Sequence, residues 1–394
     1  MVEWRYTKTV VATLRVVRSW MYEAVAVYLI CWICLFGSTC AAGESKSRDC
    51  ANPLWTDEVI GDLSRARNVA SPDLIDSNRA GITFLDNERL VVHEVVLNTN
   101  DLSSRQSSDS SPFRLRASVL DVGSGKTTAS AEWGTRVRES SIQTTSGGAL
   151  VRTGETLRLY SRDFVQEKEL TLPRSEDTYT VTVSASGKTI LINSHGEHSS
   201  HFEVLDGGTL RVRQEWSEAP PLRRLYSSSD ASIAAADFNQ EHILFSEFGS
   251  GRWNVIGGRP KLTCIGLPTL VTDSSLVNGC KEFSYLSHDG SLIFQDGFPK
   301  GEALVRKIAV SQDGKAVAVS LDRTKGSDFW DTGKGIKLVA TYVLVYDLPI
   351  KKRALTVEVN PLPKSDYDFA LSPDGSRLAI LNDRRVTVCS VPKE

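Results

Sequence analysis

The sequence places three of its six histidines within seven residues, at His195, His198 and His201. Neutral imidazole is the commonest metal ligand in proteins, so a loop that turned the three rings toward one point could hold Zn²⁺ or Cu²⁺. A polar loop can also carry histidines that bind nothing, and a spacing of three in an extended strand sends side chains to opposite faces. Both interpretations remain open. No other cofactor is predicted.

A glycine-rich segment at residues 123–127 (Gly-Ser-Gly-Lys-Thr) resembles the end of a phosphate-binding loop. Leu120 stands where that motif requires its first glycine, and strands rather than a following helix are expected on both sides. We interpret the segment as a hairpin turn. The sequence also contains no nucleophile elbow, no H-E-x-x-H and no calcium-binding loop. These absences favour a binding protein, although catalytic residues scattered over loops would leave no motif.

The first 42 residues have the pattern of a targeting segment. Scattered basic residues precede an uninterrupted apolar run from Ala24 to Phe36, and small residues continue to Ala42. A signal peptide with this pattern would direct export, which predicts a periplasmic, cell-surface or secreted protein. The uncharged stretch is also long enough to remain as a membrane anchor, and translation could start at Met1 or Met21.

Composition narrows the class of protein further. The 394 residues carry a formal net charge of −2 and are 41% hydrophobic, which is ordinary for a soluble globular chain. No basic surface for DNA or RNA is indicated, so no nucleic-acid partner is predicted. Contact with a membrane is expected only through the N-terminal segment.

Strands recur along the rest of the chain at a regular interval. Short runs rich in β-branched and aromatic residues are bounded by turn residues, and a helical period is almost absent. The clearest turns lie at 184–188, 311–315 and 372–375, where Ser-Gly or Asp-Gly joins two apolar strands. Together with weaker turns, the series is 87, 147, 187, 230, 274, 314 and 375. Most spacings are about 40–45 residues, the length of one four-stranded blade.

Two of these turns resemble a known repeat. The run from Leu371 to Ala379 (Leu-Ser-Pro-Asp-Gly-Ser-Arg-Leu-Ala) and its weaker echo from Val310 to Val317 are similar to the S-P-D-G-x-x-L/V-A repeat of bacterial WD-repeat-like and TolB-like β-propellers. The resemblance covers residues 82–394 as a pattern. It implies the fold alone, because such propellers include binding scaffolds and enzymes. The Trp-Asp pair that closes a strict WD repeat is absent.

We therefore predict an all-β fold, a seven-bladed β-propeller of four-stranded antiparallel blades, over residues 82–394. For blade three the expected strands are 179–184, 188–193, 201–205 and 209–216. Only 19 residues follow Gly375, too few for the last blade to complete four strands. Because propellers remove their exposed strand edges by closing the ring, we expect part of 55–81, within the N-terminal segment 43–81, to complete it.

Three connections between the second and third strands of a blade are elaborated, at 98–112, 194–201 and 323–336. In a four-stranded meander these connections leave every blade on one face, and insertions confined to one face usually mark the binding face. The predicted binding rim comprises Arg105, Asp109, His195, His198, His201, Arg323, Lys325, Asp328, Trp330 and Asp331. Phe329 and Trp330 among charges suit recognition of a protein, peptide or glycan, or they could cover a neighbouring blade.

The same topology suggests how the cysteines after the targeting segment could pair. Cys264 and Cys280 should lie on the rim face, which makes them the first candidate disulfide. A pair of Cys50 and Cys389 would tie the N-terminal segment to the last blade. Free buried thiols are the alternative.

Taken as a whole, the sequence favours an extracytoplasmic β-propeller that acts as a non-catalytic binding or scaffold protein. The alternative is a propeller hydrolase or lyase, metal-assisted through the three histidines.

Overall fold

The computed structural model describes most of the chain from residue 55 onward. The chain divides into two units, Met1–Ser47 and Arg48–Glu394, and every described residue belongs to the second. The described residues are 55–58, 80–97, 113–135, 140–172, 178–195, 200–218, 225–227, 233–239, 242–249, 252–255, 267–272, 275–279, 282–287, 291–298, 302–325, 337–363, 367–383 and 385–393. None of them forms a helix long and apolar enough to cross a membrane.

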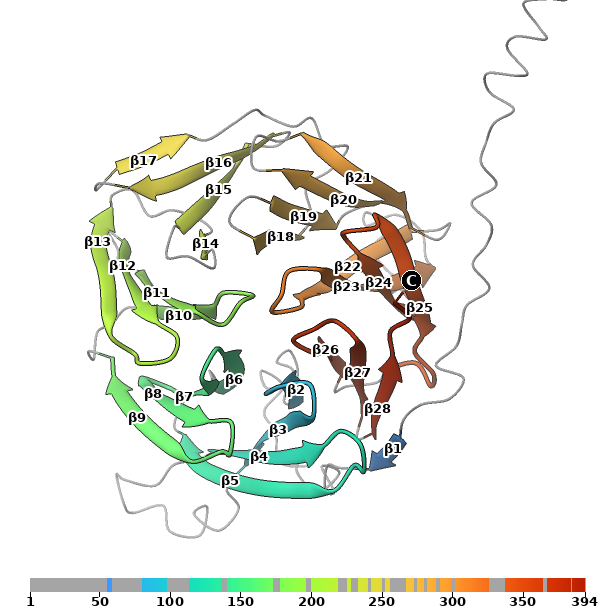
Figure 1. Cartoon of the computed structure of the whole chain (residues 1–394), viewed down its shortest axis with the longest axis horizontal. Helices are drawn as coiled ribbons and strands as arrows, with labels where there is room; N and C mark the ends of the chain where they lie inside the picture. Colours follow the sequence, from blue (N-terminus) through green and yellow to red (C-terminus); the bar gives the residue numbers. More distant parts are fainter. Residues whose placement is uncertain are drawn as a thin grey trace, which may run out of the picture. The chain divides into compact units, whose positions relative to one another are not determined.

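The described residues form seven four-stranded antiparallel sheets (Figure 1), which we number as blades one to seven. Blades one and two contain β2 (Ala80–Phe84), β3 (Arg89–Leu97), β4 (Phe113–Asp121) and β5 (Thr127–Thr135), then β6 (Ser140–Thr145), β7 (Gly148–Thr153), β8 (Thr156–Ser161) and β9 (Gln166–Thr171). Blades three and four contain β10 (Thr178–Val183), β11 (Thr189–His195), β12 (Ser200–Asp206) and β13 (Val212–Glu218), then β14 (Leu225–Ser227), β15 (Ile233–Asn239), β16 (His242–Gly249) and β17 (Arg252–Val255).

The last three blades follow the same plan. Blades five and six contain β18 (Leu267–Thr272), β19 (Ser275–Gly279), β20 (Glu282–Ser287) and β21 (Leu292–Gly297), then β22 (Glu302–Val310), β23 (Ala316–Lys325), β24 (Lys337–Asp347) and β25 (Lys352–Glu358). Blade seven contains β26 (Tyr367–Leu371), β27 (Arg377–Asn382), β28 (Arg385–Ser390) and β1 (Trp55–Glu58).

The first strands of the blades surround a common axis, down which Figure 1 looks. β2 contacts β6, contact continues in turn through β10, β14, β18, β22 and β26, and β26 contacts β2 again. Sheets arranged in this cycle define a β-propeller. The predicted all-β propeller of four-stranded antiparallel blades is therefore confirmed.

Apolar side chains fill the spaces between neighbouring blades. β7 is buried at every position because both of its faces are covered. Val151 belongs to the core shared with blade one, while its neighbour Leu150 belongs to the core shared with blade three. Successive residues of a strand point to opposite faces, so a strand packed on both sides becomes a continuous apolar run rather than an alternating one.

The Ser-x-Asp-Gly sequences form the hairpins between the first and second strands of blades six and seven. The Ser311 hydroxyl donates to the Asp313 carboxylate at 2.7 Å and accepts the Ala316 N–H at 2.9 Å. Ser372 repeats both bonds in blade seven, with Asp374 and with the N–H of Arg377. The serine and aspartate thereby satisfy backbone groups inside each turn, which explains why these residue types recur at this spacing.

The glycines of these hairpins meet two requirements at once. Gly314 and Gly375 have φ values of 68° and 67°, where a side chain would be strained. A Cβ on Gly375 would also lie 2.5 Å from the Cβ of Ala316 in blade six, and one on Gly314 would lie 2.9 Å from Thr272 in blade five. Each turn is therefore pressed against the preceding blade, and only glycine permits that approach.

We expect Gly375→Ala to lower the free energy of unfolding by about 2–3 kcal/mol, because the left-handed conformation and the contact with Ala316 both oppose a methyl group. Urea unfolding measures the change. Gly297→Ala is the matched control, since nothing lies within 4 Å of the added Cβ, and it should change stability by less than about 0.5 kcal/mol. Equal effects of the two substitutions would contradict this account.

β1 supplies the outermost strand of blade seven, from within the range 55–81 in which a closing strand was expected. It pairs antiparallel with β28, with Trp55 opposite Val388 and Glu58 opposite Arg385. Cys389, which follows Val388 in β28, is buried and disulfide-bonded. Its partner lies outside the described residues, as do Cys264 and Cys280, so their predicted pairing stays a prediction.

Candidate functional site

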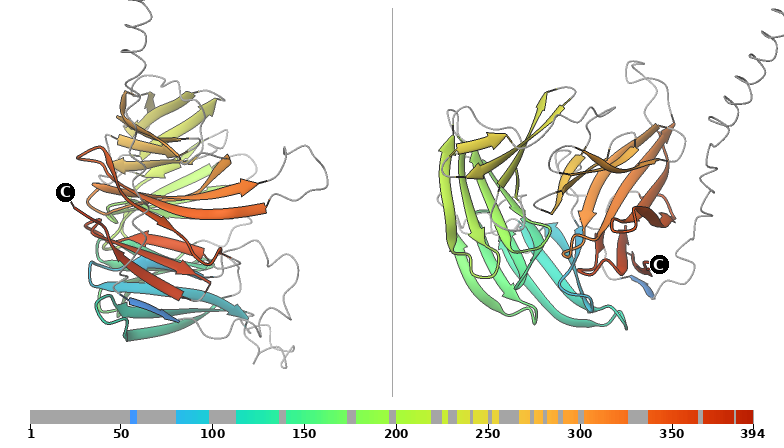
Figure 2. Two further views of the ribbon diagram at one scale, coloured as in Figure 1. Left: turned by 90° about the vertical axis from the view of Figure 1, so that its right-hand side faces the viewer. Right: turned by 45° about the horizontal axis from the view of Figure 1, so that its top comes forward.

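The strands that flank the three elaborated connections reach them at the same end of the ring. These connections join β3 to β4, β11 to β12 and β23 to β24, each time the second strand of a blade to the third. We call this the B–C end, and the opposite end, with the turns between first and second strands, the A–B end. In the left view of Figure 2, the strands of blade one (blue to teal) and blade six (orange) reach toward the same side.

Most rim residues predicted from the sequence lie outside the described residues, so the rim stays a prediction. Those outside are Arg105, Asp109, His198, Asp328, Trp330 and Asp331. Arg323 is exposed near the end of β23, Lys325 is the last residue of that strand, and His195 is the last residue of β11.

His201 already has partners within its own blade. Its Nδ1 lies 2.9 Å from the Ser217 hydroxyl, and its Nε2 lies 3.5 Å from a carboxylate oxygen of Glu203. The register places His195 opposite Ser200, the residue before His201, so positions 195 and 201 belong to opposite faces of the sheet. No group of three metal-ligating residues occurs among the described residues. The three-histidine site stays a prediction because His198 is not among them.

Buried polar side chains connect three strands at the B–C end of blade six. Asp322 in β23 accepts a hydrogen bond from the Thr341 hydroxyl at 2.9 Å and lies 3.1 Å from Nε of Arg306. Thr341 and Asp322 are both buried. These contacts connect β22, β23 and β24 close to the residues where the elaborated connection begins and ends.

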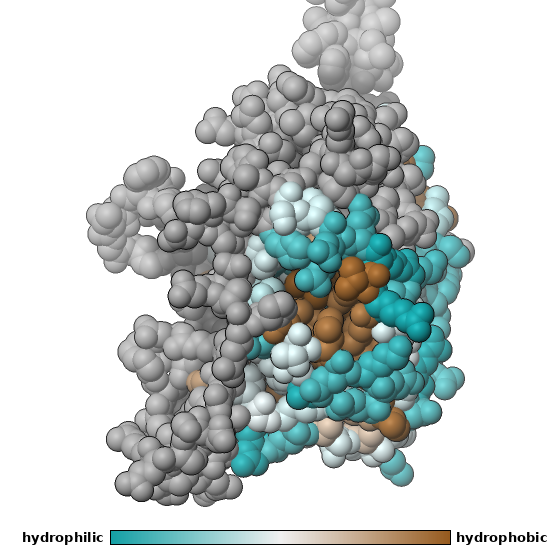
Figure 3. Space-filling model, turned by 90° about the vertical axis from the view of Figure 1, so that its left-hand side faces the viewer, coloured by the Kyte–Doolittle hydropathy of each residue, from teal (hydrophilic) through white to brown (hydrophobic). Residues whose placement is uncertain are grey.

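Two large apolar side chains are exposed at the same end of blade six. Leu304 of β22 is 65% exposed and Val339 of β24 is 41% exposed. Both stand near the B–C end of their strands, close in register to the exposed Arg323. The register puts Leu304 on the same face of the sheet as Asp322, and Arg323 on the opposite face. Exposed apolar side chains of this kind are available to a protein partner. Figure 3 shows another group of apolar atoms, surrounded by polar ones, on the side of the ring at the left of Figure 1.

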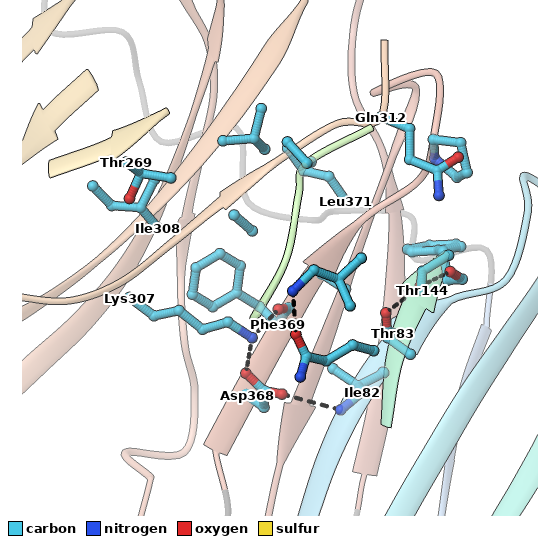
Figure 4. Close-up of a pocket in the computed structure, with 18 of the residues that line it drawn as sticks. Ile82, Thr83, Thr144, Thr269, Lys307, Ile308, Gln312, Asp368, Phe369 and Leu371 are labelled. Atoms are coloured by element: carbon cyan, nitrogen blue, oxygen red, sulfur yellow. Dashed lines mark hydrogen bonds and ion pairs between the residues drawn. The ribbon is translucent and has the colours of Figure 1, made fainter. Parts of the chain in front are cut away.

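The axis of the propeller contains a cavity of about 320 Å³. Its described lining comes from β2, β6, β10, β18, β22 and β26, together with His93 of β3 and the turns that follow the inner strands. Apolar side chains form much of the wall, and a few polar ones face the cavity (Figure 4). Such a combination is usual for small-molecule sites.

A lysine and an aspartate form an ion pair in this wall. The Lys307 ammonium of β22 donates to the Asp368 carboxylate of β26 and to the carbonyl oxygen of Phe369, the latter at 3.0 Å. The second Asp368 oxygen accepts the N–H of Ile82 at 3.0 Å, so the pair joins blades six, seven and one. The Asp368 side chain is only 12% exposed, whereas Lys307 remains 42% exposed.

His93 packs beside this pair across a glycine. Gly81 lies opposite His93 in the register, and a Cβ on Gly81 would come within 2.7 Å of the imidazole and 3.2 Å of Asp368. Nδ1 of His93 is buried and has no hydrogen-bond partner. Burial lowers the pKa of His93 from 6.5 to about 4, while Asp368 opposes this effect and Lys307 adds to it.

This pKa predicts a pH dependence of stability. Between about pH 4 and 6.5 the unfolded chain binds a proton at His93 that the folded chain does not, so stability rises with pH in that window. We expect about 2–3 kcal/mol to be lost as the pH falls from 6.5 to 4. His93→Gln should flatten the curve of stability against pH, measured by urea unfolding at stepped pH. Parallel curves for wild type and variant would contradict this assignment.

The other polar side chains of the cavity wall differ in whether their hydrogen-bonding atoms have partners. Gln143 of β6 donates to the Val181 carbonyl and accepts the Val183 N–H, both at 3.1 Å, so it bridges blades two and three. Thr83 and Thr144 are hydrogen-bonded to each other at 2.6 Å between blades one and two. Gln312, in the hairpin after β22, has a buried Nε2 without a partner.

The sequence analysis did not predict this central cavity. The one indication of it in the sequence is that Lys307 and Asp368 interrupt strands whose other residues are mainly apolar. Neither residue lies in a motif, and their partners Ile82 and His93 come from the other end of the chain, so nothing in the spacing linked them.

Comparison with known proteins gives only distant likenesses. No protein-family model and no curated protein matches the sequence. Among solved structures, the chain is similar to the C-terminal WD40 domain of Sif2, with 12% identity over 80% of this chain and 96% of that chain and a TM-score of 0.48. It is also similar to the WD40 domain of Pan2 from Neurospora crassa, with 13% identity over 82% and 92% and a TM-score of 0.49.

A third similar structure is Hsv2 from Kluyveromyces lactis, with 13% identity over 78% of this chain and 91% of that chain and a TM-score of 0.44. Identities this low concern the fold alone, and TM-scores below 0.5 decide nothing about function. The bacterial or TolB-like origin implied by the repeat stays a prediction.

Proposed function

We propose that the chain is a non-catalytic binding or scaffold propeller whose partner, a protein or peptide, contacts the B–C end. The observation that carries the proposal is the topology: three elaborated connections, far apart in sequence, all join second strands to third strands. The exposed Leu304 and Val339 at the same end of blade six support it. Removal of exposed apolar surface from water is a favourable term in most protein–protein association.

We also propose that residues 1–42 direct export. Disulfides persist mainly in oxidising compartments, so the disulfide-bonded Cys389 supports this location. A fusion of residues 1–42 to a reporter that is active only after export tests the proposal. Reporter activity is expected, and a fusion that is expressed but inactive would contradict the proposal.

The binding surface can be tested with a pair of matched double variants. Leu304→Ser with Val339→Ser removes the exposed apolar groups of the B–C end. Val165→Ser with Val212→Ser removes comparably exposed groups, 62% and 52%, that lie at turns between third and fourth strands and hence at the A–B end. Because all four side chains are exposed, neither variant should lower the melting temperature appreciably.

We expect the intact protein to capture a partner from an envelope extract, and the B–C variant to bind that purified partner about tenfold more weakly. The A–B variant should bind it as the wild type does. A variant in which residues 98–112 and 326–336 are replaced by short Gly-Ser linkers should lose the partner while melting normally. Equal binding by all variants, or a loss confined to the A–B variant, would refute the proposed surface.

A further inference from the structure

The polar groups of the central cavity include donors that are not fully hydrogen-bonded. Both oxygens of Asp368 are bonded, one to Lys307 and one to the N–H of Ile82. The Lys307 ammonium has three N–H groups, of which Asp368 and the Phe369 carbonyl engage two. Gln312 adds an amide nitrogen that is buried without a partner. The wall can therefore donate further hydrogen bonds, from Lys307 and from Gln312.

The space around these donors is apolar. Ile308 and Phe369 line the cavity next to Lys307, and Leu371 lies between Lys307 and Gln312 (Figure 4). The Lys307 ammonium also lies 5.2 Å from the centre of the Phe369 ring. An occupant that fits such a wall has an apolar body and a group that accepts hydrogen bonds from a cation.

The cavity is accessible from the A–B end. A second hollow of about 470 Å³ is lined by the turns of that end, and it shares Gln312 and Pro373 with the cavity. Gln312 therefore stands at the junction of the two, with Lys307 deeper in the channel. Access from the A–B end leaves the B–C end free for a protein partner.

We propose that the central channel binds a small organic acid, with its carboxylate on Lys307 and its apolar body against Ile308, Phe369 and Leu371. A carboxylate accepts the third ammonium hydrogen in a charge-assisted bond, which an uncharged analogue cannot match. A second acceptor on the ligand would reach the Gln312 amide. The cavity volume of about 320 Å³ is near the lower end of the range for ligand pockets, so it limits the ligand to a small molecule.

The test uses the full chain and two pairs of probes, hexanoate with hexanamide and benzoate with benzamide, at fixed ionic strength. Calorimetric titration should show both acids binding at least tenfold more tightly than their amides. The His93 imidazole signals should shift on titration, because His93 lines the cavity. Acids and amides binding equally, or neither acid binding at 10 mM, would overturn the proposal.

Two variants examine the donors, and one serves as control. Lys307→Met with Asp368→Asn removes both charges together, keeps an unbranched side chain at 307 and leaves an oxygen at 368 to accept the Ile82 N–H. It should weaken acid binding at least tenfold. Gln312→Leu should weaken it less. Lys315→Met removes an exposed cation of the A–B end outside the cavity lining and should change nothing.

An unchanged affinity in the double variant would refute the assignment of Lys307. If that variant does not fold, Gln312→Leu and the comparison of acids with amides still decide the question. Because the B–C surface does not line this cavity, failure here leaves the proposed function untouched, and loss of the protein partner leaves this inference untouched.

Discussion

Phe283→Ala is expected to lower the free energy of unfolding by about 3–5 kcal/mol, the usual cost of deleting a buried aromatic ring. The Phe283 ring of blade five stacks on the Tyr346 ring of blade six, with centroids 3.9 Å apart and planes 6° apart, and both residues are fully buried. Truncation would leave a cavity where the two blades meet and remove the aromatic contact. Urea unfolding followed by far-ultraviolet circular dichroism measures the loss.

Leu292→Ala in the same blade is the matched control. Leu292 is 54% exposed, so its truncation should change the free energy of unfolding by less than about 0.5 kcal/mol. If Phe283→Ala were as mild as Leu292→Ala, the space between blades five and six would not be the closely packed core that the contacts indicate.

Cys389→Ala is expected to lower the free energy of unfolding by about 2–5 kcal/mol, the usual cost of losing a native disulfide. Cys389 is disulfide-bonded and buried in the core between blades six and seven. We expect its partner to be Cys50, because β1 begins five residues after Cys50 and pairs with the strand that holds Cys389. Such a bond would hold the closing strand and constrain the ring.

Mass spectrometry of peptides prepared without reduction should identify the bond between Cys50 and Cys389. A reducing agent should bring wild-type stability down to that of Cys389→Ala and should leave the variant nearly unchanged. A free thiol at Cys389, or its linkage to Cys264 or Cys280, would contradict the assignment.

The repeat architecture could be predicted because its signals are local. Ser311, Asp313 and Gly314 bond within one turn, so their spacing in the sequence is itself the geometry of the hairpin. The strands predicted for blade three differ from β10 to β13 by at most three residues at any boundary. The need for a closing strand also followed from chain length, since too few residues remain after Gly375 to form three more strands.

The central cavity could not be predicted in this way. Ile82 and Asp368 are 286 residues apart, and they meet only because the ring brings blade seven against blade one. A strand in a propeller is buried on both faces, so its pattern shows that a residue is inside without showing which side chain it faces. Lys307 and Asp368 therefore appeared in the sequence as charged residues in mainly apolar strands, with nothing to link them.

The sequence by itself determined the class of fold, the length of a blade and the turn chemistry, because each depends on residues a few positions apart. Only the tertiary structure decided which side chains meet around the axis, where Lys307, Asp368 and His93 come from three different blades. Contacts of that kind depend on how the ring closes. Ring closure depends on the whole chain, so the pattern of a short segment does not predict these contacts.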